Sequence, residues 1–70
     1  MASKSSSVSY YGKLITVSAS QDSPQESAQV TSIEIDGKPV AFGPGDIEPG
    51  DTLDDAIANG LRTATSMIDY

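Results

Sequence analysis

The last third of the chain has the residue pattern of an amphipathic helix. Apolar residues recur there at three- and four-residue steps and polar residues fill the opposite side, as in a helix that lies on another element. The apolar stripe comprises Leu53, Ala56, Ile57, Gly60, Leu61, Ala64, Met67 and Ile68. Thr52 followed by Asp55 is a capping pattern, so we expect a helix over residues 52–68. Gly60 within the stripe indicates that the helix backbone comes close to its neighbour.

A second pattern, the alternation of apolar and polar residues, predicts a β-hairpin over residues 29–42. At its centre, Asp36-Gly37 is a pair favoured in two-residue type I′ turns. The opposed pairs expected from this turn are Ile35 with Lys38, Ile33 with Val40, and Thr31 with Phe42. One face then holds Ile33, Ile35, Val40 and Phe42, and we expect it to receive the helix. Val30 falls on the other face. Pro39 has no N–H to donate, which indicates either an edge strand or a position whose missing N–H faces outward.

Residues 8–19 are rich in β-branched and aromatic residues, which favour a strand. Gly12 divides this segment and leaves two interpretations open. Either Tyr11 and Gly12 form the turn of a short hairpin, or Gly12 is a bulge within one long bent strand. We favour the single strand over residues 8–19. Which of Val8, Tyr10, Tyr11 and Val30 lie on the sheet face away from the helix depends on this choice.

The remaining segments are expected to lie outside regular structure. Residues 1–7 are serine-rich, which predicts a flexible N-terminal arm. Residues 20–28 predict an exposed loop, and the Pro-Gly-Asp sequences within residues 43–50 predict the turn from sheet to helix. The predicted fold class is therefore α+β, with a three- to four-stranded antiparallel sheet and one C-terminal helix packed on one face, forming a single small domain over residues 8–70.

The composition of the 70-residue chain argues against catalysis. It contains no cysteine and no histidine, so disulfides, the common zinc ligands and the commonest general base and nucleophile are all absent. We therefore expect no enzyme, no catalytic residue and no cofactor. The apolar runs are far shorter than the ~20 residues that cross a bilayer, so we expect a cytoplasmic protein with no membrane partner.

Charge is the strongest functional signal in the sequence. Ten acidic residues against four basic ones give a net charge of −6. The acidic residues between positions 34 and 55 are Glu34, Asp36, Asp46, Glu48, Asp51, Asp54 and Asp55. They are either solvated turn and helix-start residues or a binding surface. No metal site is predicted, because the EF-hand spacing counted from Asp46 places Ile57 where a glutamate is required, although other calcium geometries stay open.

An acidic surface disfavours direct binding of nucleic acid, because such binding requires neutralisation of phosphates. It favours a basic protein surface, as found on proteins that bind nucleic acid. We therefore expect a non-enzymatic module in which these seven acids make the electrostatic contacts and Tyr10 or Tyr11 anchors them. By placing carboxylates where phosphates lie, the module would inhibit its partner as a DNA mimic.

In size, acidity and its sheet-plus-helix plan, the chain resembles small phage-encoded inhibitors, especially the acidic anti-CRISPR proteins. The resemblance implies a partner in the host cytoplasm, namely the DNA channel or PAM-reading surface of a CRISPR effector. Two alternatives remain. The chain is a structural or assembly subunit, such as a virion part or a self-associating protein, that uses the uncovered sheet face, or it is an antitoxin or immunity protein. We expect a monomer or a weak homodimer.

Overall fold

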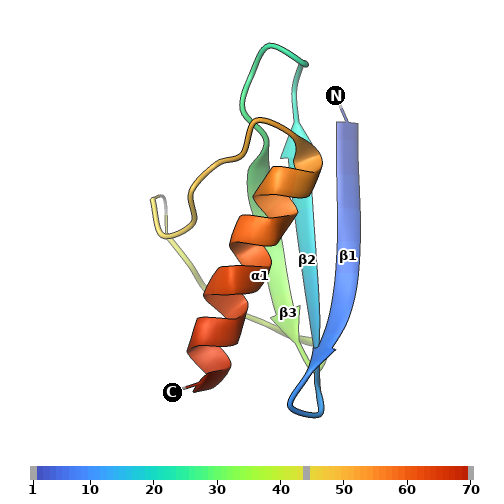
Figure 1. The fold of residues 1–70 in the computed structure, drawn as a ribbon, viewed down its shortest axis with the longest axis vertical. Helices are drawn as coiled ribbons and strands as arrows, with labels where there is room; N and C mark the ends of the chain where they lie inside the picture. Colours follow the sequence, from blue (N-terminus) through green and yellow to red (C-terminus); the bar gives the residue numbers. More distant parts are fainter. Residues whose placement is uncertain (1, 44, 70) are drawn as a thin grey trace.

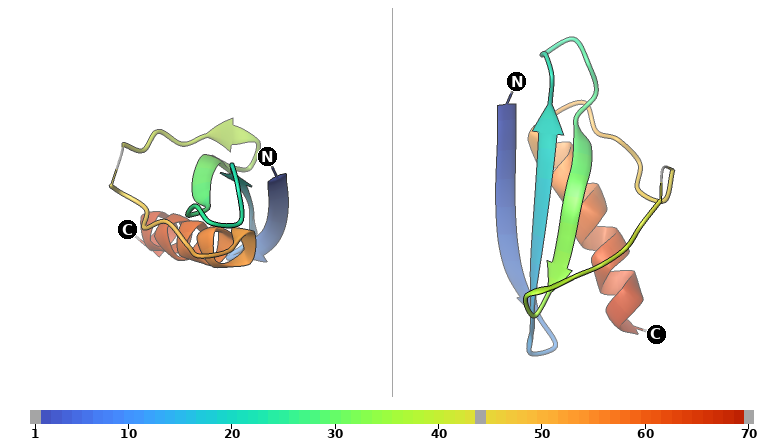
Figure 2. Two further views of the ribbon diagram at one scale, coloured as in Figure 1. Left: turned by 90° about the horizontal axis from the view of Figure 1, so that it is seen from above. Right: turned by 180° about the vertical axis from the view of Figure 1, so that it is seen from behind.

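The computed structural model describes residues 2–43 and 45–69; Met1, Pro44 and Tyr70, which belong to the predicted arm, turn and domain end, lie outside the described residues. The described residues form a four-stranded antiparallel sheet in the order β1-β2-β3-β4, with α1 across one face (Figures 1 and 2). The elements are β1 (Ala2–Tyr10), β2 (Lys13–Gln21), β3 (Gln29–Ile35), β4 (Lys38–Pro39) and α1 (Leu53–Asp69). The predicted fold class is confirmed.

The first hairpin differs from the prediction. Residues from Ala2 to Tyr10 pair with β2 along their whole length, from Ala2 opposite Gln21 to Tyr10 opposite Lys13. Tyr11 and Gly12 have φ values of 51° and 77°, as a type I′ turn requires. The predicted arm over residues 1–7 and the single bent strand over 8–19 are therefore wrong, and the hairpin interpretation is correct. Serine is a weak strand former, but the backbone ladder with β2 holds this segment in the sheet.

A bulge between β2 and β3 changes which residues face the helix. Ser18 lies opposite Ser32, but the next pair is Ala19 with Val30, so Thr31 has no opposite residue. The extra residue reverses the alternation from this point on. Val30 consequently packs against the core, while Thr31 is exposed and its Oγ1 donates to the Ser18 carbonyl at 3.3 Å. The predicted faces of Val30 and Thr31 are therefore wrong.

The second predicted turn is confirmed. Asp36 and Gly37 have φ values of 53° and 81°, Ile35 lies opposite Lys38, and the Val40 N–H donates to the Ile33 carbonyl at 2.9 Å. The described pairing of β4 stops at Pro39, which cannot donate, and the chain then leaves the sheet (Figure 2). The expected pairing of Thr31 with Phe42 is thus not formed, although Val40 and Phe42 still pack against the core.

The core lies between α1 and the centre of the sheet. Its buried residues are Ile15, Val17, Ala19, Ala28, Ile33, Ala56, Ile57 and Ala64. Gly60 is buried where α1 crosses β2 and β3, and a Cβ atom there would lie 2.7 Å from Val17 Cγ1 and 3.1 Å from Val30 Cγ2. The predicted close approach is confirmed, because any side chain at this position would clash. The predicted cap is confirmed as well, since Thr52 Oγ1 accepts from the Asp55 N–H at 3.1 Å.

Main-chain bonds fix the start of α1 to the loop between β2 and β3. Ala28 and Gly50 exchange two backbone hydrogen bonds of 2.8 and 3.0 Å. The Gln21 side-chain amide donates to the carbonyls of Glu26 and Asp51 at 2.8 and 3.2 Å. The β2–β3 loop and the helix start therefore form one end of the molecule, while the β1–β2 and β3–β4 turns form the other (Figure 1).

Candidate functional site

The predicted acidic residues are divided between the two ends of the molecule. Asp51, Asp54 and Asp55 lie at the helix start, whereas Glu34 and Asp36 lie beside the β3–β4 turn, at the opposite end of the sheet (Figure 1). The longest dimension of the molecule is 36 Å. The hairpin turn and the helix start are therefore not neighbours, and the seven acids expected to make the contacts together do not lie on one surface.

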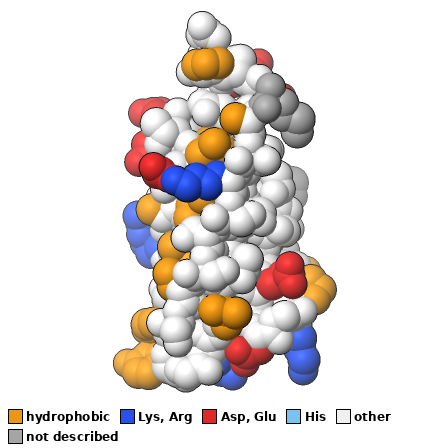
Figure 3. Space-filling view, turned by 90° about the vertical axis from the view of Figure 1, so that its right-hand side faces the viewer, with side chains coloured by type: hydrophobic (Ala, Val, Ile, Leu, Met, Phe, Trp, Pro, Cys, Tyr) orange, Lys and Arg blue, Asp and Glu red, His pale blue; other side chains and the backbone are white. Residues whose placement is uncertain are grey.

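The helix start instead gains acidic neighbours from the β2–β3 loop. We call this group the acidic end; it consists of Asp22, Glu26, Asp51, Asp54 and Asp55, and all of these residues are exposed. Lys4, on β1, reaches it and pairs through Nζ with Asp54 Oδ1. Figure 3 shows acidic side chains beside a basic one toward this end of the β1 edge. Asp22 and Glu26 were not predicted as site residues, because their proximity to Asp51 depends on the tie between loop and helix.

Two of the other predicted acids serve the fold. Asp36 Oδ1 accepts from the Leu14 N–H at 2.9 Å, and its Oδ2 lies 3.9 Å from Lys13 Nζ. Asp46 Oδ2 accepts from the Gly43 N–H at 2.7 Å. These two carboxylates stabilise turns, as expected from the interpretation of the acids as structural residues. Glu34 is exposed on the uncovered sheet face, and Glu48 is exposed on the crossover, where its carbonyl accepts from the Asn59 side-chain amide at 3.0 Å.

The two tyrosines do not join the acidic end. They lie at the β1–β2 turn, with ring centroids 4.6 Å apart in an edge-to-face arrangement. Tyr10 packs against the core, whereas Tyr11 is 80% exposed. The predicted combination of helix-start acids and tyrosines on one surface is therefore not present.

The sheet face away from α1 is lined by hydroxyl groups. We call this surface the hydroxyl face; its members are Ser3, Ser5, Ser7, Ser9, Thr16, Ser18, Ser20 and Ser32. Opposed hydroxyls bond across the strands, with Ser5 to Ser18 and Ser7 to Thr16 both at 2.9 Å. Val8 lies instead on the helix side, because it pairs with the buried Ile15. The apolar patch expected on this face is therefore absent from the described residues; Leu14, 51% exposed, is the large apolar side chain there.

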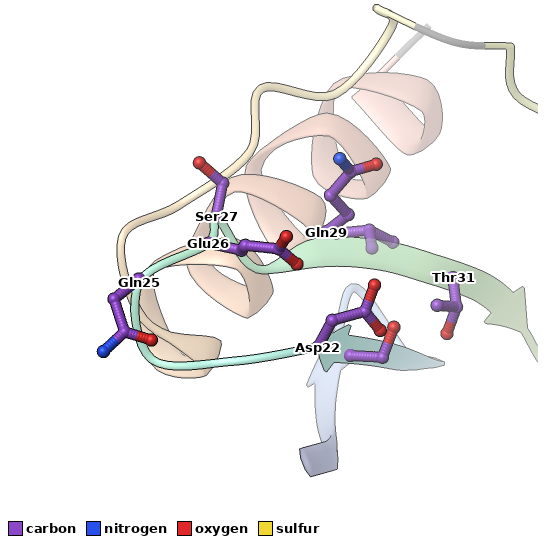
Figure 4. Close-up of a pocket in the computed structure, with 8 residues that line it drawn as sticks. Asp22, Gln25, Glu26, Ser27, Gln29 and Thr31 are labelled. Atoms are coloured by element: carbon purple, nitrogen blue, oxygen red, sulfur yellow. The ribbon is translucent and has the colours of Figure 1, made fainter. Parts of the chain in front are cut away.

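An open hollow borders the acidic end between the β2–β3 loop and β3 (Figure 4). Its lining consists of Ser20, Asp22, Gln25, Glu26, Ser27, Gln29, Val30 and Thr31. The carboxylates of Asp22 and Glu26 are directed into this hollow. With two acids, amides and hydroxyls but no basic residue in its lining, the hollow suits a cationic group.

The comparisons with known proteins were made with protein-family models, curated proteins and solved structures. None of them gives a match. The resemblance to acidic anti-CRISPR proteins therefore stays a prediction.

Among residues 2–43 and 45–69, no three acidic side chains are grouped as metal ligands would be. Within the same residues, no helix has the length and apolar character that crossing a membrane requires.

Proposed function

We propose that this protein is a non-enzymatic binding module whose acidic end docks on a basic surface of another protein. The observation that carries the proposal is the grouping of exposed carboxylates from two segments far apart in the sequence. Asp22 and Glu26 come from the β2–β3 loop, and Asp51, Asp54 and Asp55 from the helix start. Main-chain bonds between Ala28 and Gly50 hold the two segments together, so the carboxylates are positioned before a partner arrives.

The hollow between Asp22 and Glu26 gives this docking a specific contact. An arginine or lysine side chain of the partner would enter it and form charge-assisted hydrogen bonds with both carboxylates. Electrostatic interactions between exposed groups are screened over about 8 Å at physiological salt. The acids of the acidic end therefore act together, and Glu34 at the far end of the sheet contributes little.

Proteins that bind nucleic acid present basic surfaces of the required kind, and we propose that the partner is one of them. The acidic end would occupy the place of phosphates and block the partner's nucleic-acid site. Because the acids form a compact group and not a long track, the block would fall on a local basic site. The PAM-reading surface of a CRISPR effector in the cytoplasm of a host cell is one such site. An antitoxin or immunity protein would dock in the same way on a different partner.

The assembly alternative depended on an apolar, uncovered sheet face. Hydroxyl groups line that face in the described residues, so the structure does not favour assembly through it.

Two single charge reversals test the acidic docking, because both change the net charge equally. Asp51→Lys alters the acidic end and Glu34→Lys the opposite end, and neither side chain is bonded to another described residue. Binding to purified CRISPR effectors and other nucleic-acid-binding proteins is measured by biolayer interferometry at low and high salt. We expect Asp51→Lys to slow association and weaken its salt dependence, while Glu34→Lys has little effect. Equal effects of the two reversals would contradict docking through the acidic end.

A further inference from the structure

The outer edge of β1 carries backbone groups that no other described strand pairs with. Tyr10 and Lys13 flank a two-residue turn and so form a hydrogen-bonded pair, which makes the even-numbered residues of β1 the ones that bond to β2. The odd-numbered residues Ser3, Ser5, Ser7 and Ser9 therefore direct their N–H and C=O groups away from the sheet. Such a row is a template for pairing with another strand.

The two edges of the sheet differ in how they are protected. β4 is two residues long, contains Pro39, and is followed by a chain that leaves the sheet. These features prevent edge pairing. β1 is nine residues long and pairs with β2 without a bulge or a proline. Its one charged residue, Lys4, is engaged with Asp54 on the helix side. Neither a helix nor a loop of the described chain passes outside β1 (Figures 1 and 2).

We propose that two copies of this chain associate by antiparallel pairing of their β1 edges, joining their sheets into one. In the register that uses the whole strand, a two-fold axis passes at Ser6. Ser3 then lies opposite Ser9, and Ser5 lies opposite Ser7. The outward N–H and C=O groups of these serines pair across the axis, and the hydroxyl face continues through the joined sheet.

The side chains of β1 fit a second copy. On the helix side, Lys4 lies opposite Val8 of the other copy, so the two Lys4 side chains do not face each other across the interface. Val8 is 37% exposed, and the aliphatic stem of the facing lysine would cover it. On the hydroxyl face, small serines oppose small serines and leave the backbones free to approach.

The charge distribution favours the antiparallel arrangement over a parallel one. A parallel pair would bring two acidic ends together, and each copy carries a net charge of −6. The antiparallel pair separates the two acidic ends and places each beside the β1–β2 turn of the other copy, where Lys13 and Asp36 offset each other. Self-association uses the β1 edge and the docking proposed above uses the acidic end; Lys4, which pairs with Asp54, is the residue that borders both surfaces, and neither proposal rests on the other.

The interface is one strand wide, well below the ~1,600 Å² of a standard interface, so we expect a weak, reversible dimer. Salt distinguishes it from acidic docking. Salt screens the repulsion between two acidic copies and so strengthens the dimer, whereas it weakens docking of the acidic end on a basic partner.

Sedimentation equilibrium of the full chain over a range of concentrations and salt tests the proposal, with Ser5→Pro and Ser5→Ala as a matched pair. Both variants remove the Ser5 hydroxyl, but only proline removes the outward N–H, once in each copy of the dimer. We expect a salt-strengthened dimer for the wild type and for Ser5→Ala. For Ser5→Pro we expect a dissociation constant raised roughly tenfold or more. Circular dichroism confirms that each variant is folded.

Residue-resolved amide hydrogen exchange of the wild type gives a test that does not depend on the variants. The amides of Ser3, Ser5, Ser7 and Ser9 should become protected as the concentration rises, whereas those bonded to β2 should not change. A wild type that stays monomeric at every concentration and salt would overturn the proposal and leave the edge to an extended segment of another protein. The proposal would also be overturned if folded Ser5→Pro dimerised as tightly as the wild type. The same holds if the exchange rates of the outward amides did not change with protein concentration.

Discussion

Replacement of Gly60 by alanine tests how closely α1 lies on the sheet. In an exposed helix interior, alanine is more stable than glycine by about 1 kcal/mol. At position 60, however, the new Cβ would lie 2.7 Å from Val17 Cγ1 and 3.1 Å from Val30 Cγ2. The first of these distances is shorter than real carbon contacts, so either the helix or Val17 must move. Val17 is fully buried in the central part of β2 and has a stiff branched side chain, so it cannot turn away at low cost.

The magnitude follows from these opposing effects. Overpacking a tight core costs about 1–3 kcal/mol, and we expect the upper part of that range because both contacting residues belong to paired strands. Subtracting the helix-propensity gain leaves a net destabilisation of about 1–2 kcal/mol. In a domain of this size, that loss lowers the melting temperature by roughly 4–16 °C.

Urea unfolding followed by circular dichroism measures the change, with Ala58→Gly as the control. Ala58 is exposed on the same helix, so its replacement reports the propensity difference without a change in packing, and should cost about 1 kcal/mol. Gly60→Ala should also destabilise, although it is the reverse substitution. In a Val17→Ala background, which removes the clashing methyl groups, the cost of Gly60→Ala should fall or change sign. If Gly60→Ala stabilises the wild type by as much as Ala58→Gly destabilises it, the close approach is not real.

Two further predictions concern hydrogen bonds of the chain to its own backbone. Thr52→Ala removes the acceptor for the Asp55 N–H and should cost about 1 kcal/mol, while Thr52→Ser should remain near the wild type in the same unfolding assay. Asp36→Ala loses the acceptor for the Leu14 N–H and places alanine at a φ of 53°, so we expect a loss of about 1–3 kcal/mol. Asp36→Asn keeps an acceptor and tolerates this φ, and should be close to the wild type. An equal loss in Asp36→Asn would instead assign the effect to the exposed ion pair with Lys13.

The elements with strong local signals were predictable from sequence. The helix has a continuous apolar stripe and a capping pair, and Asp36-Gly37 is the residue pair that its turn demands. Tyr11-Gly12 gave a misleading signal, because a tyrosine seldom adopts a positive φ. A period-two pattern was nevertheless present in Ser3, Ser5, Ser7 and Ser9, which share one face of β1. Serine carries too little apolar contrast for that alternation to indicate a strand.

The bulge at Thr31 was not predictable from regular alternation. Val30 and Ile33 are three residues apart, so in a regular strand they would point to opposite faces of the sheet. Both face the helix, because the extra residue between them reverses the alternation. A strictly alternating pattern therefore places one of these two apolar residues on the wrong face. The odd spacing of Val30 and Ile33, two apolar residues of one strand, was the sequence feature that indicated a bulge.

The division of the acids follows from topology and not from composition. In an antiparallel sheet with sequential strand order, successive turns alternate between the two ends, so the β2–β3 loop lies opposite the β3–β4 turn. An extended chain advances about 3.3 Å per residue, so residues 40–52 are long enough to cross the 36 Å of the molecule.

The helix starts beside the loop between β2 and β3, where Gly50 pairs with Ala28, and so at the end opposite the β3–β4 turn. A short turn after Pro39 would have placed the helix start and Asp36 at the same end, with one cluster of acids. The long crossover instead separates the helix start from Asp36 and places the helix-start acids beside Asp22 and Glu26 of the β2–β3 loop. The end that the crossover reaches is therefore the one at which exposed carboxylates from the loop and the helix start come together.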